Sequence, residues 1–136
     1  MVEVQLSRIV IRETSDQQRI YLREKAGSRE FPIVIGLHEA AAIDRRVRDK
    51  PPPRPMTHDL MAALVKELGA RVERVVISAL KQNTFFARID LVPAGADAPR
   101  PVDARPSDAI ALAAHLGAPI YVEEGVLDDV LASPSD

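Results

Sequence analysis

The sequence of 136 residues contains no cysteine and no tryptophan. The absence of thiols excludes thiolate catalysis, zinc sites with cysteine ligands and a disulfide framework, and it is compatible with a reducing compartment. Besides histidine, the aromatic side chains are two tyrosines and three phenylalanines. So few platforms for base stacking argue against a protein dedicated to binding single strands.

An excess of positive charge is also missing, because 18 basic residues face 20 acidic ones and the formal net charge is −2. Any binding of nucleic acid must therefore come from a local patch. No hydrophobic run approaches the length of a membrane span, and the first residues alternate in polarity instead of forming a signal peptide. We expect a soluble cytoplasmic protein that does not associate with membranes.

Several enzyme signatures are absent as well. Ser107 does not lie in a GxSxG elbow, and the chain has neither a glycine-rich phosphate loop nor an HExxH metal motif.

The hydrophobic share of 46% and the length indicate one domain, residues 1–131, followed by a flexible tail, 132–136. Alternating and β-rich stretches predict strands, the first with a bulge near Ser7-Arg8; they span 2–11, 18–24, 31–35, 72–80, 84–92, 101–104 and 119–123. Pro32 favours an edge strand. Helical spacing predicts helices over 37–47, from Thr57 to the stop at Gly69, from Pro106 to Gly117, and over 126–131.

Hairpins at both ends of this order, with one strand–helix–strand passage near the C-terminus, predict an α/β domain of the α+β type. The expected sheet is mixed or largely antiparallel, with helices packed on it. In the 57–69 helix, Thr57 is expected to be the N-cap, and an apolar stripe comprises Leu60, Met61, Leu64, Val65 and Leu68.

Four separated motifs occur in order along nearly the whole chain: 31–36 with Glu39-Ala40, 54–60, 84–87 and 103–113. Together they resemble the bifunctional nuclease family, also called the DNase-RNase domain. The resemblance implies a compact α/β domain that self-associates at least as a dimer, and hydrolysis of both DNA and RNA. Phe86 departs from the tyrosine expected in many relatives, which removes a possible hydroxyl.

Phosphodiester hydrolysis needs an activated water and charge stabilisation, which carboxylates holding Mg²⁺ or Mn²⁺ can supply. The acids within the matching motifs are Glu39, Asp59, Asp103 and Asp108. Asp59, Asp103 and Asp108 are the metal-ligand candidates, and Glu39, Asp59 and Asp108 are also catalytic candidates. The alternative for Asp59 and Asp108 is structural, because an acid in a first helical turn is favourable whatever the function.

His58 is the histidine best suited to acid–base catalysis, with a surface position at a helix start as its alternative. His38 and His115 are interpreted as structural or solvent-facing. Arg105 precedes a proline and could clamp a phosphate or form a structural salt bridge with a neighbouring acid.

The only marked run of positive charge comprises Arg45, Arg46, Arg48, Lys50 and Arg54. It is either a solvated helix face or a surface that follows a phosphate backbone. The leading hypothesis is a nuclease of low sequence selectivity in which these arginines bind substrate, and the alternative is a non-catalytic interaction or regulatory module.

Overall fold

The computed structural model describes residues 1–12 and 14–132. Within these ranges seven strands form one sheet of order β3-β2-β1-β7-β4-β5-β6. The strands are β1 (Val2–Val10), β2 (Gln18–Glu24), β3 (Glu30–Ile35), β4 (Arg71–Lys81), β5 (Thr84–Val92), β6 (Arg100–Ala104) and β7 (Ile120–Val122). The helices are α1 (Leu37–Val47), α2 (Thr57–Glu67), α3 (Pro106–Leu116) and α4 (Glu124–Ala132). The predicted α+β domain with a mixed sheet is confirmed.

Strand β7 joins the two halves of the sheet, since it pairs antiparallel with β1 and parallel with β4. The parallel pair requires a crossover connection, and α3 supplies it between β6 and β7. The predicted bulge is present where the β1–β2 register shifts between Leu6 and Arg8. It keeps Leu6 and Ile9 on the core side although they differ in parity. Pro32 lies on β3, an edge strand, as predicted.

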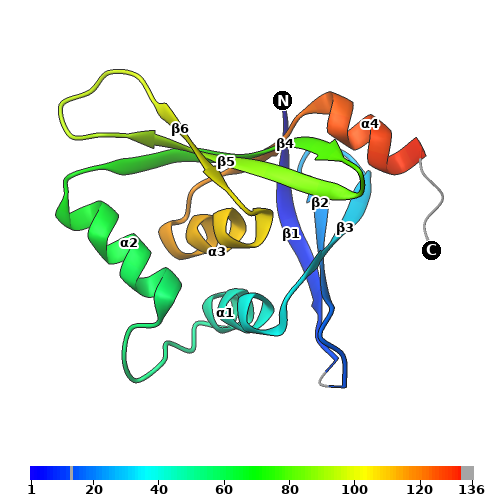
Figure 1. The fold of residues 1–136 in the computed structure, drawn as a ribbon, viewed down its shortest axis with the longest axis horizontal. Coiled ribbons are helices and arrows are strands. Elements are labelled where there is room, and N and C mark those ends of the chain that lie inside the picture. Colours follow the sequence, from blue (N-terminus) through cyan, green and yellow to red (C-terminus); the bar gives the residue numbers. More distant parts are fainter. Residues whose placement is uncertain (13, 133–136) are drawn as a thin grey trace.

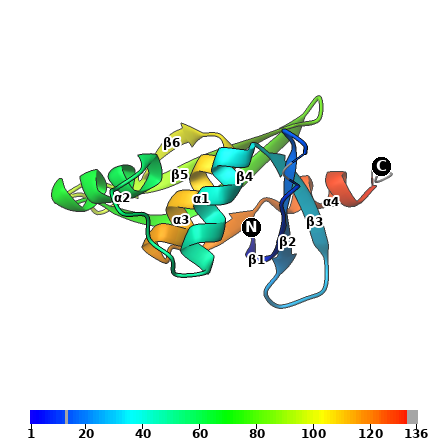
Figure 2. The ribbon, with the colours of Figure 1, turned by 90° about the horizontal axis from the view of Figure 1, so that it is seen from below.

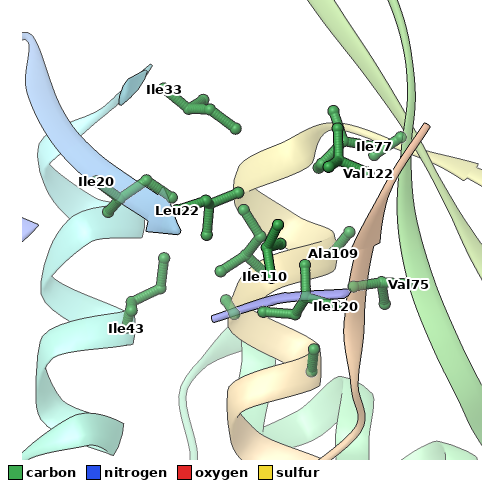
Figure 3. Packing of buried hydrophobic residues seen from close by; sticks show 14 of the residues in the cluster. Ile20, Leu22, Ile33, Ile43, Val75, Ile77, Ala109, Ile110, Ile120 and Val122 are labelled. Carbon is green, nitrogen blue, oxygen red and sulfur yellow. The ribbon is translucent and has the colours of Figure 1, made fainter. Parts of the chain in front are cut away.

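The two halves of the sheet run across each other, and α1 and α3 lie in the angle between them (Figure 1, Figure 2). Helix α3 is buried over most of its length, which explains its small residues: Ala109, Ala111 and Ala113 let α1, α2, β4 and β5 pack around it. Ile110 of α3 packs near Ile20 and Leu22 of β2 and Ile43 of α1 in the same core (Figure 3). Helix α3 is thereby fixed at the centre of the molecule.

Helix α3 also begins and ends as the sequence predicts. Pro106 is its first residue, and Gly117 closes it in the left-handed conformation at φ 70°, donating its N–H to the carbonyl of Ala113.

Helix α2 differs from the prediction at its start and on its surface. Its N-cap is Met56, not Thr57, because the chain is still extended at Met56 and the Asp59 carboxylate accepts the Met56 N–H at 2.9 Å. The predicted Thr57 cap is therefore wrong. The apolar stripe is split, since Met61 and Val65 are half-buried whereas Leu60, Leu64 and Leu68 are 53%, 54% and 74% exposed.

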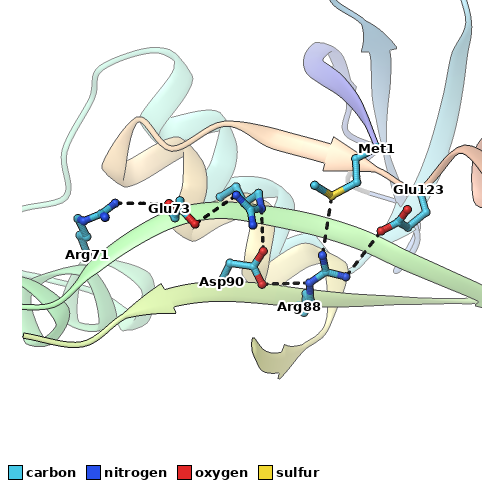
Figure 4. Close-up of polar contacts among 7 residues, drawn as sticks. Met1, Arg71, Glu73, Arg88, Asp90 and Glu123 are labelled. Atoms are coloured by element: carbon cyan, nitrogen blue, oxygen red, sulfur yellow. Dashed lines mark hydrogen bonds and ion pairs between the residues drawn. The ribbon is translucent and has the colours of Figure 1, made fainter. Parts of the chain in front are cut away.

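The outer face of β4 and β5 carries a network of charges (Figure 4). Asp90, with only 5% of its side chain exposed, accepts a hydrogen bond from Nε of Arg88 at 3.0 Å. Nε of Arg74 lies 2.8 Å from the other carboxylate oxygen of Asp90. These two atoms form an ion pair, but their geometry does not meet the angles of a hydrogen bond. Two arginines therefore compensate one buried carboxylate, which makes this cluster structural.

Residue 132 ends α4, and the rest of the predicted tail, 133–136, lies outside the described residues. Among the helices of the described chain, none has the length and hydrophobicity to cross a bilayer.

Candidate functional site

Three helices place an acid at the same position, the third residue after the N-cap. These acids are Glu39 in α1, Asp59 in α2 and Asp108 in α3. Each is favoured there by the positive end of the helix dipole. The packing of α3 against both α1 and α2 then brings helix ends from distant motifs together.

Helices α2 and α3 are joined crosswise by two histidine–carboxylate pairs. Nε2 of His58 in α2 lies 3.0 Å from Oδ1 of Asp108 in α3. Nε2 of His115 in α3 lies 3.0 Å from Oδ1 of Asp59 in α2. Each helix therefore contributes one imidazole and one carboxylate.

Asp108 is the centre of the larger cluster. Arg105 donates to both of its oxygens, at 2.8 Å from Nε and 3.1 Å from Nη2. Burial alone would raise the pKa of Asp108, but the hydrogen bonds and positive charges of Arg105 and His58 outweigh burial and hold that pKa below its ordinary value. Asp108 is consequently a carboxylate at neutral pH.

Glu39 joins this cluster through Arg105, whose Nη2 lies 3.3 Å from Oε1 of Glu39. The side chain of Glu39 folds back over the backbone of Gly36, where a Cβ would collide with the carboxylate. Gly36 therefore provides the space that lets an α1 acid reach an α3 arginine.

The state of His58 follows from its partner. An ionised carboxylate can only accept, so Nε2 of His58 carries the proton and Nδ1 is a free lone pair in the neutral ring. In the described part of the chain Nδ1 has no hydrogen-bond partner, and it is not a buried atom. His58 thus has the form of an oriented general base.

His115 has the opposite arrangement, because its Nδ1 is buried and unpartnered among the described atoms. Because this atom is out of reach of solvent and substrate, His115 is suited to positioning Asp59. Of the two interpretations of His115, structural or solvent-facing, its contact with Asp59 favours the structural one. Its separation of seven residues from Asp108 was an available signal, since two helical turns bring both onto one face of α3.

His58, Asp59 and His115 line a pocket closed by the C-terminal end of α1 and the proline loop. Its volume is about 70 Å³, which is room for a few water molecules or one small polar group. Arg45, Arg46 and Lys50 line the same pocket, together with the acidic Asp49. The pocket therefore brings an imidazole base and a group of cations together.

Three other candidates lie apart from the pocket. Arg48 pairs with Asp44 at 3.0 Å, Arg54 is exposed in the proline loop, and Asp103 is exposed on the edge strand β6. In the ranges that the structure covers, no three His, Asp or Glu side chains are grouped so as to hold a metal ion. Asp59, Asp103 and Asp108 do not converge, and the residues present do not fit Mg²⁺ or Mn²⁺ as a ligand set.

Comparison with known proteins places this arrangement in a family. Residues 20–134 match the bifunctional nuclease domain. The chain belongs to the bifunctional nuclease domain family. It is also 44% identical over 127 residues to two uncharacterized proteins of Mycobacterium tuberculosis, MT1877 of strain CDC 1551 / Oshkosh and Rv1829 of strain ATCC 25618 / H37Rv. The match covers 93% of this chain and 74% of each relative.

In this bifunctional nuclease domain, motifs far apart in sequence meet around one helix. Glu39, His58 and Asp108 come from three of the four motifs and are linked through Arg105 and Asp108. The remaining motif contributes Thr84 and Phe85 to a groove that Arg105 also lines. Phe86 itself is 41% exposed on β5, so a tyrosine there would present its hydroxyl away from the core.

Proposed function

We propose that this chain hydrolyses phosphodiester bonds of DNA and RNA at the pocket between α1, α2 and α3. The observation that carries the proposal is the orientation of His58, whose Nε2–H is held by an ionised Asp108 while Nδ1 is free. The family match supports a nuclease-related activity.

In the proposed reaction, Nδ1 of His58 removes a proton from a water molecule as the water oxygen attacks phosphorus. The bond between phosphorus and the leaving oxygen breaks on the side opposite the attacking water. The leaving oxygen takes a proton from solvent, and the imidazolium then releases its proton to solvent. Arg45, Arg46 and Lys50 offset the charge that develops on the phosphate. These contacts are to the backbone, so the cleavage has low sequence selectivity.

Arg105 and Glu39 act behind His58 in this mechanism. Arg105 keeps Asp108 ionised and fixed, and Glu39 limits the freedom of the exposed Arg105 side chain. The role given to Arg105 is therefore positioning, and the substrate clamp that the sequence suggested stays a prediction.

The test replaces the proposed base and a histidine outside the site. His58→Gln should lower cleavage of single-stranded DNA and RNA by about 10²–10⁴-fold, the usual contribution of general acid–base catalysis. His38→Gln is the matched control, because His38 is exposed on α1 and has no polar partner in the described structure. Equal activity of a folded His58→Gln protein and the control would reject the proposal.

Dependence on Mg²⁺ or Mn²⁺ stays a prediction from the chemistry of phosphodiester hydrolysis, and no step above uses a metal cation. Activity lost in chelator and recovered with either ion would establish it. Location in the cytoplasm likewise stays a prediction from composition.

Self-association at least as a dimer is proposed for the exposed stripe of α2. Leu60, Leu64 and Leu68 recur every fourth residue and lie on one helix face, each more than half exposed. The same stripe is the observation that favours the second candidate function, a non-catalytic interaction module. Detectable turnover that depends on His58 separates the two functions.

A further inference from the structure

Strand β2 presents arginine and tyrosine side chains away from the core. Ile20 and Leu22 are fully buried, so the alternating Arg19, Tyr21 and Arg23 lie on the opposite face of the strand. Helices α1 and α3 occupy the core side of β1 to β3 (Figure 1, Figure 2). On the face of β2 away from these helices, Arg19 and Arg23 are exposed and Tyr21 is half-buried.

Arg8 of β1 completes this group, because it lies opposite Tyr21 in the β1–β2 register. Its guanidinium carbon lies 3.8 Å from the centroid of the Tyr21 ring, a stacked cation–π arrangement. We call Arg8, Arg19, Tyr21 and Arg23 the β2 face.

The β2 face is positive although the chain as a whole is slightly acidic. Arg19 and Arg23 are exposed, and neither forms an ion pair among residues 1–12 and 14–132, although Glu30 lies opposite Arg23 in the β2–β3 register. The side chain of Arg8 is 58% exposed, and its Nη2 lies 3.5 Å from Oε1 of Glu30. An ion pair this exposed contributes little free energy, so a phosphate can replace Glu30 as the partner of Arg8.

We propose that the β2 face binds single-stranded nucleic acid. Three guanidinium groups around one ring match the chemistry of such a ligand, in which phosphates alternate with bases that can unstack. Arg19 and Arg23 hold phosphates, and a base stacks on the Tyr21–Arg8 pair. The scarcity of aromatic residues argued against a surface dedicated to single strands, but the strand register places one of the two tyrosines among arginines.

A path for the strand leads from the β2 face to the His58 pocket. Arg8 and Arg48 line one groove between β1 and the end of α1, where Arg48 is paired with Asp44, and Arg45 and Arg46 of the same helix end line the pocket. The inference rests on the proposed function in taking nucleic acid as the ligand, and it adds where the strand outside the pocket is held.

The experiment measures binding of labelled 20-mers of deoxythymidine and uridine by fluorescence anisotropy at several salt concentrations, with probe integrity checked on a gel. Replacing both Arg19 and Arg23 by Gln should reduce the log–log salt slope by about 1.4, since each lost contact to a single strand contributes about 0.7. The matched control replaces Lys66 and Arg100 by Gln, two exposed cations outside the β2 face, and should keep the slope.

Stacking is tested by Tyr21→Ala, which should weaken binding about tenfold, and by Tyr21→Phe, which should retain it. An unchanged slope in the arginine double variant would overturn the proposal. So would equal competition by polyglutamate of the same charge, because the face would then be a general site for acidic polymers.

The same titrations on a His58→Gln background separate this inference from the proposed function. Binding that depends on Arg19 and Arg23 supports the β2 face even where cleavage is never detected. Cleavage that requires His58 but is indifferent to both arginines, in KM as well as kcat, would support the pocket and reject the β2 face.

Discussion

The substitution Asp108→Asn distinguishes a catalytic role of the Asp108 carboxylate from a role in folding. The substitution keeps the shape of the side chain but removes the charge that Arg105 and His58 share. An Asn amide can donate to Nε2 of His58 as well as accept from it, so the neutral ring is free to carry its proton on Nδ1. The proposed base would then lack its lone pair in a large fraction of molecules.

The expected loss follows from the contacts. Failure of an oriented general base costs at least about 100-fold in activity, or roughly 2.7 kcal/mol of transition-state stabilisation. The cost in folding is smaller, about 1 kcal/mol, because the Arg105 side chain is 65% exposed and solvent replaces much of its pairing with Asp108.

Asp59→Asn is the matched control. Asp59 also joins a helix start to a histidine, but its partner His115 has a buried Nδ1 that does not reach substrate. Degradation of single-stranded DNA and RNA is measured beside denaturant unfolding of each variant. Asp59→Asn should lose stability through its contact with Met56 and, although Asp59 lines the pocket, should lose less activity per folded molecule than Asp108→Asn. A folded Asp108→Asn protein with wild-type activity would refute the assignment of His58 as an oriented base.

Four further outcomes are expected. Thr57→Ala should change the free energy of unfolding by less than about 0.5 kcal/mol in urea titrations, because Thr57 is not the N-cap; a loss near 1 kcal/mol would restore the cap. Leu64→Glu should convert the proposed dimer into a monomer in light scattering, and an unchanged mass would exclude the α2 stripe as the interface. Asp90→Asn should cost roughly 1–2 kcal/mol in thermal unfolding, less than a fully buried pair since both arginines are partly exposed, and a neutral result would contradict the network. Because the pKa of Asp108 is lowered below 3.8, its contribution to stability is complete above that pH and is lost as pH falls through the folded-state pKa; unfolding of Asp108→Asn should therefore depend less on pH in this range, and parallel curves would argue against the charge network.

Local chemistry made most of the fold predictable. The strand over 18–24, the helix over 37–47, the bulge in β1 and the turn of α3 at Gly117 were all readable, because each depends on residues within a few positions of one another. The Thr57 cap was predicted wrongly, although it too depends on neighbouring residues. A good capping residue lay one position inside the helix, and the carboxylate of Asp59 capped Met56 instead.

Long-range packing set the limits of that reasoning. The apolar stripe of α2 did not determine which of its residues face the core, because either side of so wide a stripe could be buried. The exposure of Leu64 to solvent could be seen only in the three-dimensional structure. The β2 face was missed because Arg19 and Arg23 are four positions apart and do not form a run of charge. An even spacing of this kind brings side chains onto one face of a strand.

The crosswise pairs between α2 and α3 explain how one arrangement can serve both folding and chemistry. Asp59 and Asp108 occupy equivalent positions at two helix starts, and each orients an imidazole of the other helix. The pair with a buried Nδ1 joins the two helices, and in the other pair Nδ1 is not buried and its ring lines the pocket that the α1 cations also line. Burial of one ring nitrogen, and not residue type, therefore distinguishes the structural histidine from the proposed catalytic one.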